Sequence, residues 1–142
     1  CVSPRQFEQI LDTGPLVALI DRSDPDHERC AQLLATTSER RVVPLCVLVE
    51  VEYLLRPWPG GFAALMTDVN AGRLETHLPD DHELARAAAL VDTYADLPLG
   101  FVDASVLAAV EHLSETKVAT LDRRHFNIAR PSHVDHLTLL PD

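Results

Sequence analysis

The sequence predicts a three-layer α/β/α fold with a central, mainly parallel sheet, as a single domain over residues 1–142. Short apolar runs alternate with longer helical patterns, which is typical of parallel strands joined by right-handed helical crossovers. A chain of 142 residues is long enough to bury an apolar core without disulfides. We find no internal repeat, low-complexity tract or linker, so two domains are not expected.

A first strand over residues 7–11 is expected to lead into two helices. The first helix begins near Pro15, because proline suits the first helical turn. Its shared face consists of Leu16, Leu19 and Ile20. The second helix is expected to have Asp24 as its N-cap and Pro25 at its first position. Its buried stripe consists of Cys30, Leu33 and Leu34.

A second strand over residues 41–44 is expected to lead into two further helices. One covers residues 47–55 and ends before Pro57, because proline cannot continue a helix. The other covers residues 62–71 and ends at Gly72. This part of the chain therefore repeats the pattern of one strand followed by two helices.

The second half of the chain continues the alternation. We expect a strand over residues 74–78, a helix capped by Asp80 or Asp81, and a helix over residues 102–113. The first of these helices runs through Leu84, Ala88 and Val91. The second turns inward Val106, Leu107 and Val110. Two short strands complete the sheet, over residues 118–121 and 136–140.

Four acidic residues, far apart in the sequence, lie at the edges of these elements. Asp12 and Asp122 each follow a strand, Asp103 lies in the first turn of a helix, and Glu50 lies on a helix face. In open parallel sheets the functional site lies at the carboxyl ends of the strands. Carboxylates without an accompanying cysteine–histidine ligand set favour a hard divalent cation such as Mg²⁺.

Each of these acids also has an ordinary structural explanation. Asp103 would stabilise a helix dipole, and Asp12 would serve as a turn residue. Glu50 is harder to explain in this way, because its neighbours along the helix are apolar and an unpaired buried carboxylate is costly. We expect the adjacent Glu52 to face solvent.

Four segments of the sequence, taken in order, carry a resemblance to a known family. They are residues 11–19 (LDTGPLVAL), 49–51 (VEV), 102–108 (VDASVLA) and 120–126 (TLDRRHF). Together they resemble the PIN-domain ribonucleases, specifically the VapC toxins of type II toxin–antitoxin systems. The resemblance extends over nearly the whole chain and is specific because of the ordered set, since a lone Asp-Thr-Gly is a weak signal.

The resemblance implies a metal-dependent endoribonuclease. Asp12, Glu50, Asp103 and Asp122 match the acidic quartet of the family and would be both catalytic residues and metal ligands. One or two Mg²⁺ ions, for which Mn²⁺ could substitute, would activate water and stabilise charge on the leaving oxygen. We expect Asp12 and Asp103 to bind metal directly, and Glu50 and Asp122 to bind it directly or through water.

Candidate substrate-binding residues lie beside these acids. Thr13 and Thr120 offer hydroxyl groups, and Arg123 and Arg124 offer positive charge to RNA phosphates, as does His125. Each has an alternative: Thr13 would shape the turn, and the basic residues would belong to a solvated loop. The remaining histidines show no zinc-ligand spacing, so surface or capping roles are expected for His27, His77, His82, His112, His133 and His136.

The resemblance also implies partners, namely an RNA substrate, a cognate VapB-like antitoxin and a second copy of the chain in a homodimer. The apolar helices at residues 16–20 and 47–55 would form a partner groove as well as core. The main rival is a catalytically silent PIN-like module that binds RNA or protein without cutting. The presence of all four acids disfavours it. A DNA nuclease of related fold would need basic or helical insertions that this chain does not carry.

Composition bounds the remaining possibilities. The net charge is −10, so the chain as a whole does not attract nucleic acid, and any contact with RNA must be local. No apolar run reaches the length of a membrane span and no signal peptide is evident, so no membrane partner is expected. Three cysteines without C-x-x-C pairing indicate reduced thiols and a cytoplasmic protein. Because Cys1 stands where Met would begin a protein, we expect a tag or disordered residues before it.

Overall fold

The computed structural model describes residues 8–36, 39–97, 99–129, 131–134 and 137–141. Within these ranges five strands form one sheet, in the order β3-β2-β1-β4-β5, and every neighbouring pair is parallel. The strands are β1 (Glu8–Leu11), β2 (Arg40–Pro44), β3 (Glu75–His77), β4 (Lys117–Ala119) and β5 (Thr138–Leu140). The expected parallel α/β architecture is confirmed.

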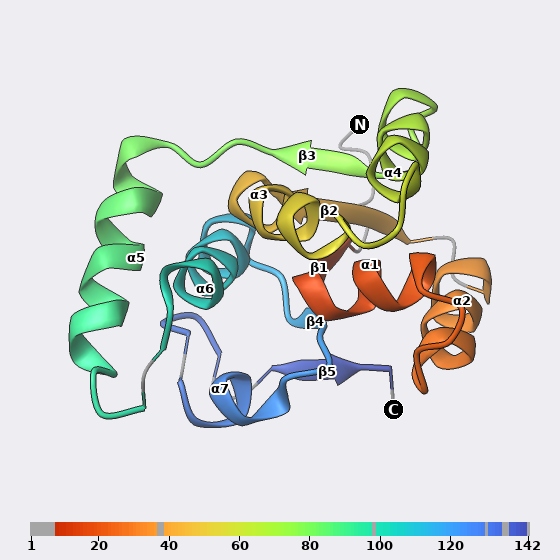
Figure 1. The fold of residues 1–142 in the computed structure, drawn as a ribbon. Helices are drawn as coiled ribbons and strands as arrows, with labels where there is room; N and C mark the ends of the chain where they lie inside the picture. Colours follow the sequence, from red (N-terminus) through yellow and green to blue (C-terminus); the bar gives the residue numbers. More distant parts are fainter. Residues whose placement is uncertain (1–7, 37–38, 98, 130, 135–136, 142) are drawn as a thin grey trace.

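The helices of the described ranges cover both faces of the sheet (Figure 1). They are α1 (Thr13–Ile20), α2 (His27–Thr36), α3 (Leu45–Leu54), α4 (Gly61–Asn70), α5 (Asp81–Thr93), α6 (Phe101–Leu113) and α7 (Arg123–Ile128). In Figure 1, α1, α2 and α4 lie to one side of the sheet, and α5 and α6 lie to the other. Helix α3 packs against both α1 and α6. This arrangement agrees with right-handed crossovers between parallel strands.

The core is centred on β1 and α6. All four residues of β1 are buried, because this strand has a neighbour on each edge and helices over each face. Helix α6 buries seven consecutive residues, 104–110, so it is enclosed on nearly every side. The expected inward-facing residues Val106, Leu107 and Val110 are all fully buried. A helix buried all round is held rigidly, which matters for the side chains at its ends.

Helix α2 begins later than the sequence predicts. Asp24 does not cap this helix; instead its carboxylate accepts a hydrogen bond from the backbone N–H of Asp26 at 2.8 Å. Its carbonyl accepts the N–H of His27 at 3.0 Å. Because a short acidic side chain can close a local turn as readily as cap a helix, residues 24–26 form a turn and α2 starts at His27.

The end of β4 also differs from the expectation. A strand through Leu121 was expected, whereas β4 ends at Ala119 and Asp122 follows it by three residues. The hydroxyl group of Thr120 accepts the backbone N–H of Asp122 at 3.1 Å, which turns the chain out of the sheet. The helix α7 that follows was not expected, since a solvated loop was one interpretation of its first residues.

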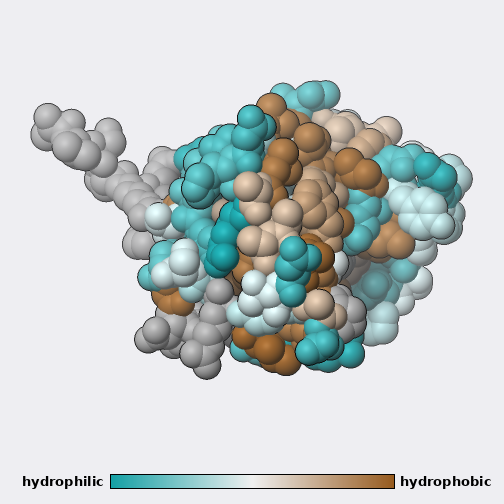
Figure 2. Space-filling model, turned by 90° about the vertical axis from the view of Figure 1, so that its left-hand side faces the viewer, coloured by the Kyte–Doolittle hydropathy of each residue, from teal (hydrophilic) through white to brown (hydrophobic). Residues whose placement is uncertain are grey.

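Helix α5 presents a different face from the one the sequence suggested. Its buried residues are Glu83, Ala87 and Leu90, whereas Leu84 is 38% exposed. Asp80 is the N-cap, and Asp80 and Glu83 form a reciprocal capping box. Figure 2 looks onto the side of the molecule where α5 lies and shows hydrophobic surface along the middle of this face.

Two cysteines lie within the described residues. Cys30 is buried and Cys46 is half-buried, and both are free thiols, as expected. Cys1, Phe7 and His136 lie outside the described residues. Among the helices of the described ranges, none is long and apolar enough to cross a membrane.

We predict that Leu107→Ala lowers the free energy of unfolding by about 2–5 kcal/mol, because truncating a fully buried leucine removes apolar contacts and leaves a cavity. Urea denaturation followed by circular dichroism measures the change. Leu84→Ala on the half-exposed position of α5 is the matched control and should change stability by no more than about 0.5 kcal/mol. Equal losses in the two variants would contradict the described core.

Candidate active site

An open cavity of about 730 Å³ lies at the carboxyl edge of the sheet. It is next to the ends of β1 and β4, where the strand order reverses direction, the usual position of a ligand site in an open parallel sheet. Its lining residues come from four segments of the chain and are Asp12, Thr13, Gly14, Glu50, Leu54, Gly100, Phe101, Val102, Asp103, Leu121, Asp122 and Arg124. The four acids singled out in the sequence thus meet at one cavity.

Asp12 connects the ends of the two central strands. Its backbone N–H donates to the carbonyl of Ala119 at 2.9 Å, and its Oδ2 accepts the hydroxyl of Thr120 at the same distance. Although Asp12 is the N-cap residue of α1, its side chain makes no capping hydrogen bond. The carboxylate is therefore turned to Thr120 and the cavity, and its position does not serve the helix end.

Asp103, Asp122 and His125 form a second part of the site. Nδ1 of His125 lies 2.5 Å from Oδ2 of Asp103 and 3.8 Å from Oδ2 of Asp122. Asp103 projects from the first turn of α6, while Asp122 and His125 lie at the start of α7. The side chains of Asp103 and His125 are 19% and 15% exposed; Asp103 lines the cavity, and His125, which does not, pairs with it.

Glu50 completes the acidic lining from helix α3. It is half-buried, because the neighbouring Val49 and Leu54 are exposed and leave an open path from the carboxylate to the cavity. The sequence argument that its apolar neighbours would keep Glu50 dry does not hold for these two residues. Glu52 faces solvent as expected and pairs with Arg56 on the helix surface.

Burial and crowding raise the pKa of two of these acids. The pKa of Asp12 is raised from 3.8 to about 6, mainly because the side chain is buried, and further by the negative charges of Asp103 and Glu50. Hydrogen bonds from Thr13 and Thr120 act in the opposite direction. Burial also raises the pKa of Asp103, against the lowering effect of His125. The site therefore stores repulsion that a bound cation would relieve.

The donor set fits a hard divalent cation. The cavity is lined by four carboxylates, and ligand atoms of Asp103, Asp122 and His125 all lie within 4.8 Å of one another. The hydroxyl of Thr13 is buried beside Asp12 and has no hydrogen-bond partner among the described residues. Oxygen-rich sites of this kind suit Mg²⁺ or Mn²⁺, and the unpaired hydroxyl is available to a metal-bound water or a substrate oxygen.

The structure separates the candidate substrate-binding residues. Arg124 lines the cavity, with its side chain 83% exposed and its Nε 3.5 Å from Oδ1 of Asp122. Arg123 is not among the lining residues, and its guanidinium donates to the backbone carbonyl of Pro141 instead. Thr13 lines the cavity, and Thr120 lies behind Asp12, fully buried. Of the two arginines, only Arg124 is positioned beside the acids.

Two features of the site were not recognised in the sequence. His125 was considered only as a phosphate contact, whereas it pairs with Asp103 from a helix that the sequence did not reveal. Gly14 lies so close to Leu121 that an added Cβ would stand 3.1 Å from the leucine Cβ. This close approach of the α1 start to the segment after β4 brings Asp12 near Asp122, and it would be a tight fit for any larger residue.

The sequence is similar to that of a known protein family and of one of its ribonucleases. The sequence matches the PIN domain family over residues 10–131. Ribonuclease VapC26 from Mycobacterium tuberculosis is 30% identical over 134 residues, which cover 93% of this chain and 99% of that protein. The similarity therefore includes every element that contributes to the cavity.

Solved structures share the fold. The crystal structure of VapC20 from Mycobacterium tuberculosis, a Sarcin-Ricin loop cleaving toxin, has a TM-score of 0.78 at 20% identity, covering 89% of this chain and 98% of that chain. VapBC2 from Rickettsia felis, bound to a promoter DNA fragment, has a TM-score of 0.63 at 18% identity, with coverages of 94% and 98%. FitAcB from Neisseria gonorrhoeae has a TM-score of 0.62 at 20% identity, with coverages of 94% and 96%.

We predict that Asp12→Asn raises the stability of the metal-free protein at neutral pH. A carboxyl group with a raised pKa favours the folded state when protonated, so its contribution is complete below pH 3.8 and is lost as the pH rises through about 6. The rise of the Asp12 pKa from 3.8 to about 6 corresponds to about 3 kcal/mol of folding free energy, which the amide variant does not lose at neutral pH. Urea denaturation in EDTA, at pH values from about 3.5 to about 7.5 that span the titration of Asp12, measures the effect.

The expected gain at neutral pH is about 1–3 kcal/mol, shrinking toward zero below the ordinary pKa of a carboxyl group. Asp92→Asn on the exposed surface of α5 is the control and should leave the pH dependence unchanged. If Asp12→Asn and the wild type lose stability in parallel as the pH rises, the described burial of Asp12 is wrong.

Proposed function

Because this chain belongs to the PIN domain family, we propose that it is a divalent-metal-dependent endoribonuclease that acts as the toxin of a VapBC-type toxin–antitoxin pair. The observation that carries the proposal is the meeting of four carboxylates from four separate segments at one cavity. A ribonuclease relative that is similar over nearly the whole chain supports RNA as the substrate.

The surroundings of the four acids suggest different roles in metal binding. Asp12 is buried and Asp103 half-buried, and both have raised pKa values, so they gain most from a neighbouring cation and would bind it directly. Asp122 is 41% exposed and Glu50 is half-buried at the cavity edge, which suits ligation directly or through water. Bound Mg²⁺ or Mn²⁺ would supply an activated water and stabilise charge on the leaving oxygen.

The neighbouring side chains would position the RNA. Arg124 is exposed beside Asp122 and can contact a phosphate that flanks the scissile one. The unpaired hydroxyl of Thr13 can donate to a phosphate oxygen or to a bound water. Thr120 holds Asp12 in place and does not need to contact RNA. Because Arg123 is engaged by Pro141, we assign the substrate contact to Arg124.

A catalytically silent binding module of the same fold is the alternative. Such a module would not need to maintain a site whose acids repel one another, because repulsion costs stability without serving the binding of RNA or protein. All four acids are present and line the cavity. The nuclease is therefore the better-supported function.

We propose that a VapB-like antitoxin covers the apolar surface beside the cavity. Helix α3 exposes large hydrophobic side chains, and Phe101 at the start of α6 is 47% exposed. Leu54 of α3 and Phe101 also line the cavity. A partner segment that packs on these residues would block the entrance to the acids, which accounts for inhibition without a change in the site. A homodimer is a further proposal, and light scattering of the purified chain tests it.

We predict that Asp12→Asn and Asp103→Asn each reduce RNA cleavage by about 100-fold or more, because each removes a direct metal ligand. Purified protein is incubated with total cellular RNA and Mg²⁺ or Mn²⁺, and the new ends are mapped. EDTA should abolish cleavage by the wild type. Glu52→Gln on the solvent face of α3 is the control and should cleave normally.

Cleavage by either site variant at the wild-type rate would refute the assignment of the acids. If the wild type binds metal and folds but yields no fragments from any RNA, the silent module becomes the better reading.

We predict that Val49→Asp weakens binding of the cognate VapB-like antitoxin by at least about tenfold, because it places a charge in the centre of the apolar surface. Titration calorimetry measures the affinity. Leu78→Asp is the matched control, since Leu78 and Val49 are both 67% exposed but only Val49 lies on α3. Equal losses, or no loss in Val49→Asp, would show that the antitoxin binds elsewhere.

A further inference from the structure

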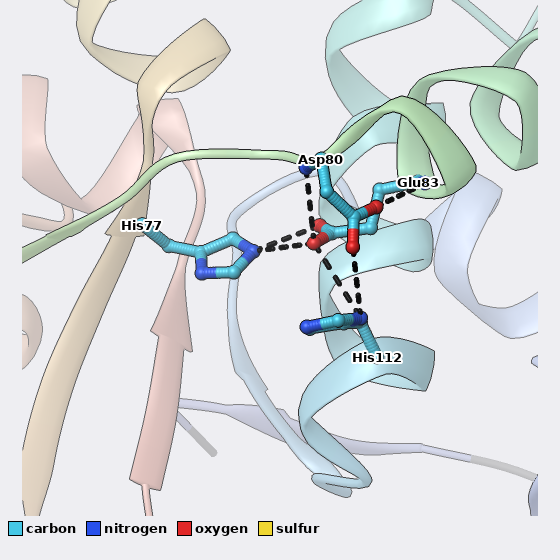
Figure 3. A network of polar contacts seen from close by, with 4 residues as sticks. All are labelled: His77, Asp80, Glu83 and His112. Carbon is cyan, nitrogen blue, oxygen red and sulfur yellow. Dashed lines mark hydrogen bonds and ion pairs between the residues drawn. The ribbon is translucent and has the colours of Figure 1, made fainter.

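A second cluster of ligating side chains lies at the opposite end of α6 from the nuclease site. It consists of His77 at the end of β3, Asp80 and Glu83 at the start of α5, and His112 in the last turn of α6 (Figure 3). Asp103 and His112 are nine positions apart on α6, so the two clusters are separated by about 13 Å along the helix. The two sites therefore share no side chain.

The four side chains converge on Glu83. Its carboxylate is 3% exposed, and Nε2 of His77, itself 15% exposed, lies 2.8 Å from one of its oxygens. Nδ1 of His112 lies 3.6 Å from Oε1 of Glu83 and 4.0 Å from Oδ2 of Asp80. Figure 3 shows both imidazole rings turned with one nitrogen toward the carboxylates. The ligand atoms of Asp80, Glu83 and His112 thus form one group, and His77 is hydrogen-bonded to the Glu83 carboxylate.

The capping box accounts for only part of this arrangement. Oδ1 of Asp80 accepts the backbone N–H of Glu83 at 2.8 Å, which fulfils its N-cap role. The other oxygen, Oδ2, is the one that faces His112. Helix capping therefore leaves a charged oxygen available beside the two histidines.

The distances from His112 to the two carboxylates fit ligands of a metal ion better than they fit hydrogen bonds. At 3.6 and 4.0 Å, the contacts of His112 Nδ1 are too long for hydrogen bonds. Two ligands bound at about 2.1 Å in a tetrahedral site lie roughly 3.4 Å apart. The ligand atoms of Asp80, Glu83 and His112 all lie within 4.8 Å of one another, so small side-chain rotations would bring them into coordination.

We propose that Asp80, Glu83 and His112 form a second metal site, for a borderline divalent cation such as Zn²⁺, with His77 orienting the Glu83 carboxylate. The imidazole of His112 favours Zn²⁺ over Mg²⁺, and a hydrogen bond such as that from His77 is the usual support of a metal-binding carboxylate. A bound ion would join α5 to α6 and, through His77, to the edge strand β3. It would act as a structural clamp, since the cluster faces no part of the cavity that holds the acids.

Titration with Co²⁺, a spectroscopic substitute for Zn²⁺, tests the proposal on the full chain in excess Mg²⁺. The wild type should bind one equivalent with the intense visible absorption of tetrahedral Co²⁺, and added Zn²⁺ should remove this signal. His112→Asn and Glu83→Gln should each weaken binding by on the order of tenfold or more. His112 is 44% exposed, so its variant is expected to fold, and circular dichroism verifies this.

Two histidine controls separate this site from other sources of signal. His82→Asn changes an exposed histidine on α5 outside the cluster and should titrate as the wild type does. His125→Asn removes the imidazole of the nuclease site, so any part of the Co²⁺ signal that this variant lowers belongs to that site and not to the cluster around Glu83. The test of this metal site is therefore independent of the test of the proposed nuclease. Absence of the tetrahedral signal in the wild type, or its persistence at full affinity in His112→Asn, would overturn it.

Discussion

The hydrogen bond from Thr120 to Asp12 is the contact on which the rest of the active site depends. It joins the residue after β1 to the residue after β4, which are adjacent strands separated by more than a hundred positions in the sequence. Because only 5% of Asp12 is exposed, leaving its carboxylate without a hydrogen-bond donor would be costly. The same threonine hydroxyl accepts the N–H of Asp122 and so sets the direction of the chain at this fourth acid.

The crowding of the acids lowers the stability of the folded protein. Asp12, Asp103 and Glu50 repel one another, and burial denies them the screening of water. Below a pH of about 6 the repulsion is relieved because Asp12 holds a proton, and at neutral pH a bound cation would relieve it. His125 reduces the repulsion at Asp103 by pairing with it. Strain of this kind is expected at a functional site and is compensated by the buried surroundings of β1 and α6.

The sequence predicts the parallel sheet and the meeting of the four acids at one edge of it, because both depend on local patterns. Short apolar runs ending in an acid are visible in one dimension, and their meeting follows from parallel strands sharing a carboxyl edge. Helix α7 escaped recognition because it has six residues, begins with two arginines and has no side-chain cap at Asp122. The position of Leu84 was also not predictable from periodicity, since the reciprocal capping box with Asp80 turns Glu83 inward.

The histidines show where one-dimensional reasoning stops. His77 and His112 have no ligand spacing in the sequence, and only the packing of α5 against α6 brings both rings to Glu83. Helix α6 carries Asp103 in its first turn and His112 in its last, each at the end where its charge suits the helix dipole. Because the residues between them are buried, α6 cannot shift at one end alone. An ion at the His112 end would therefore stabilise the packing of the whole of α6.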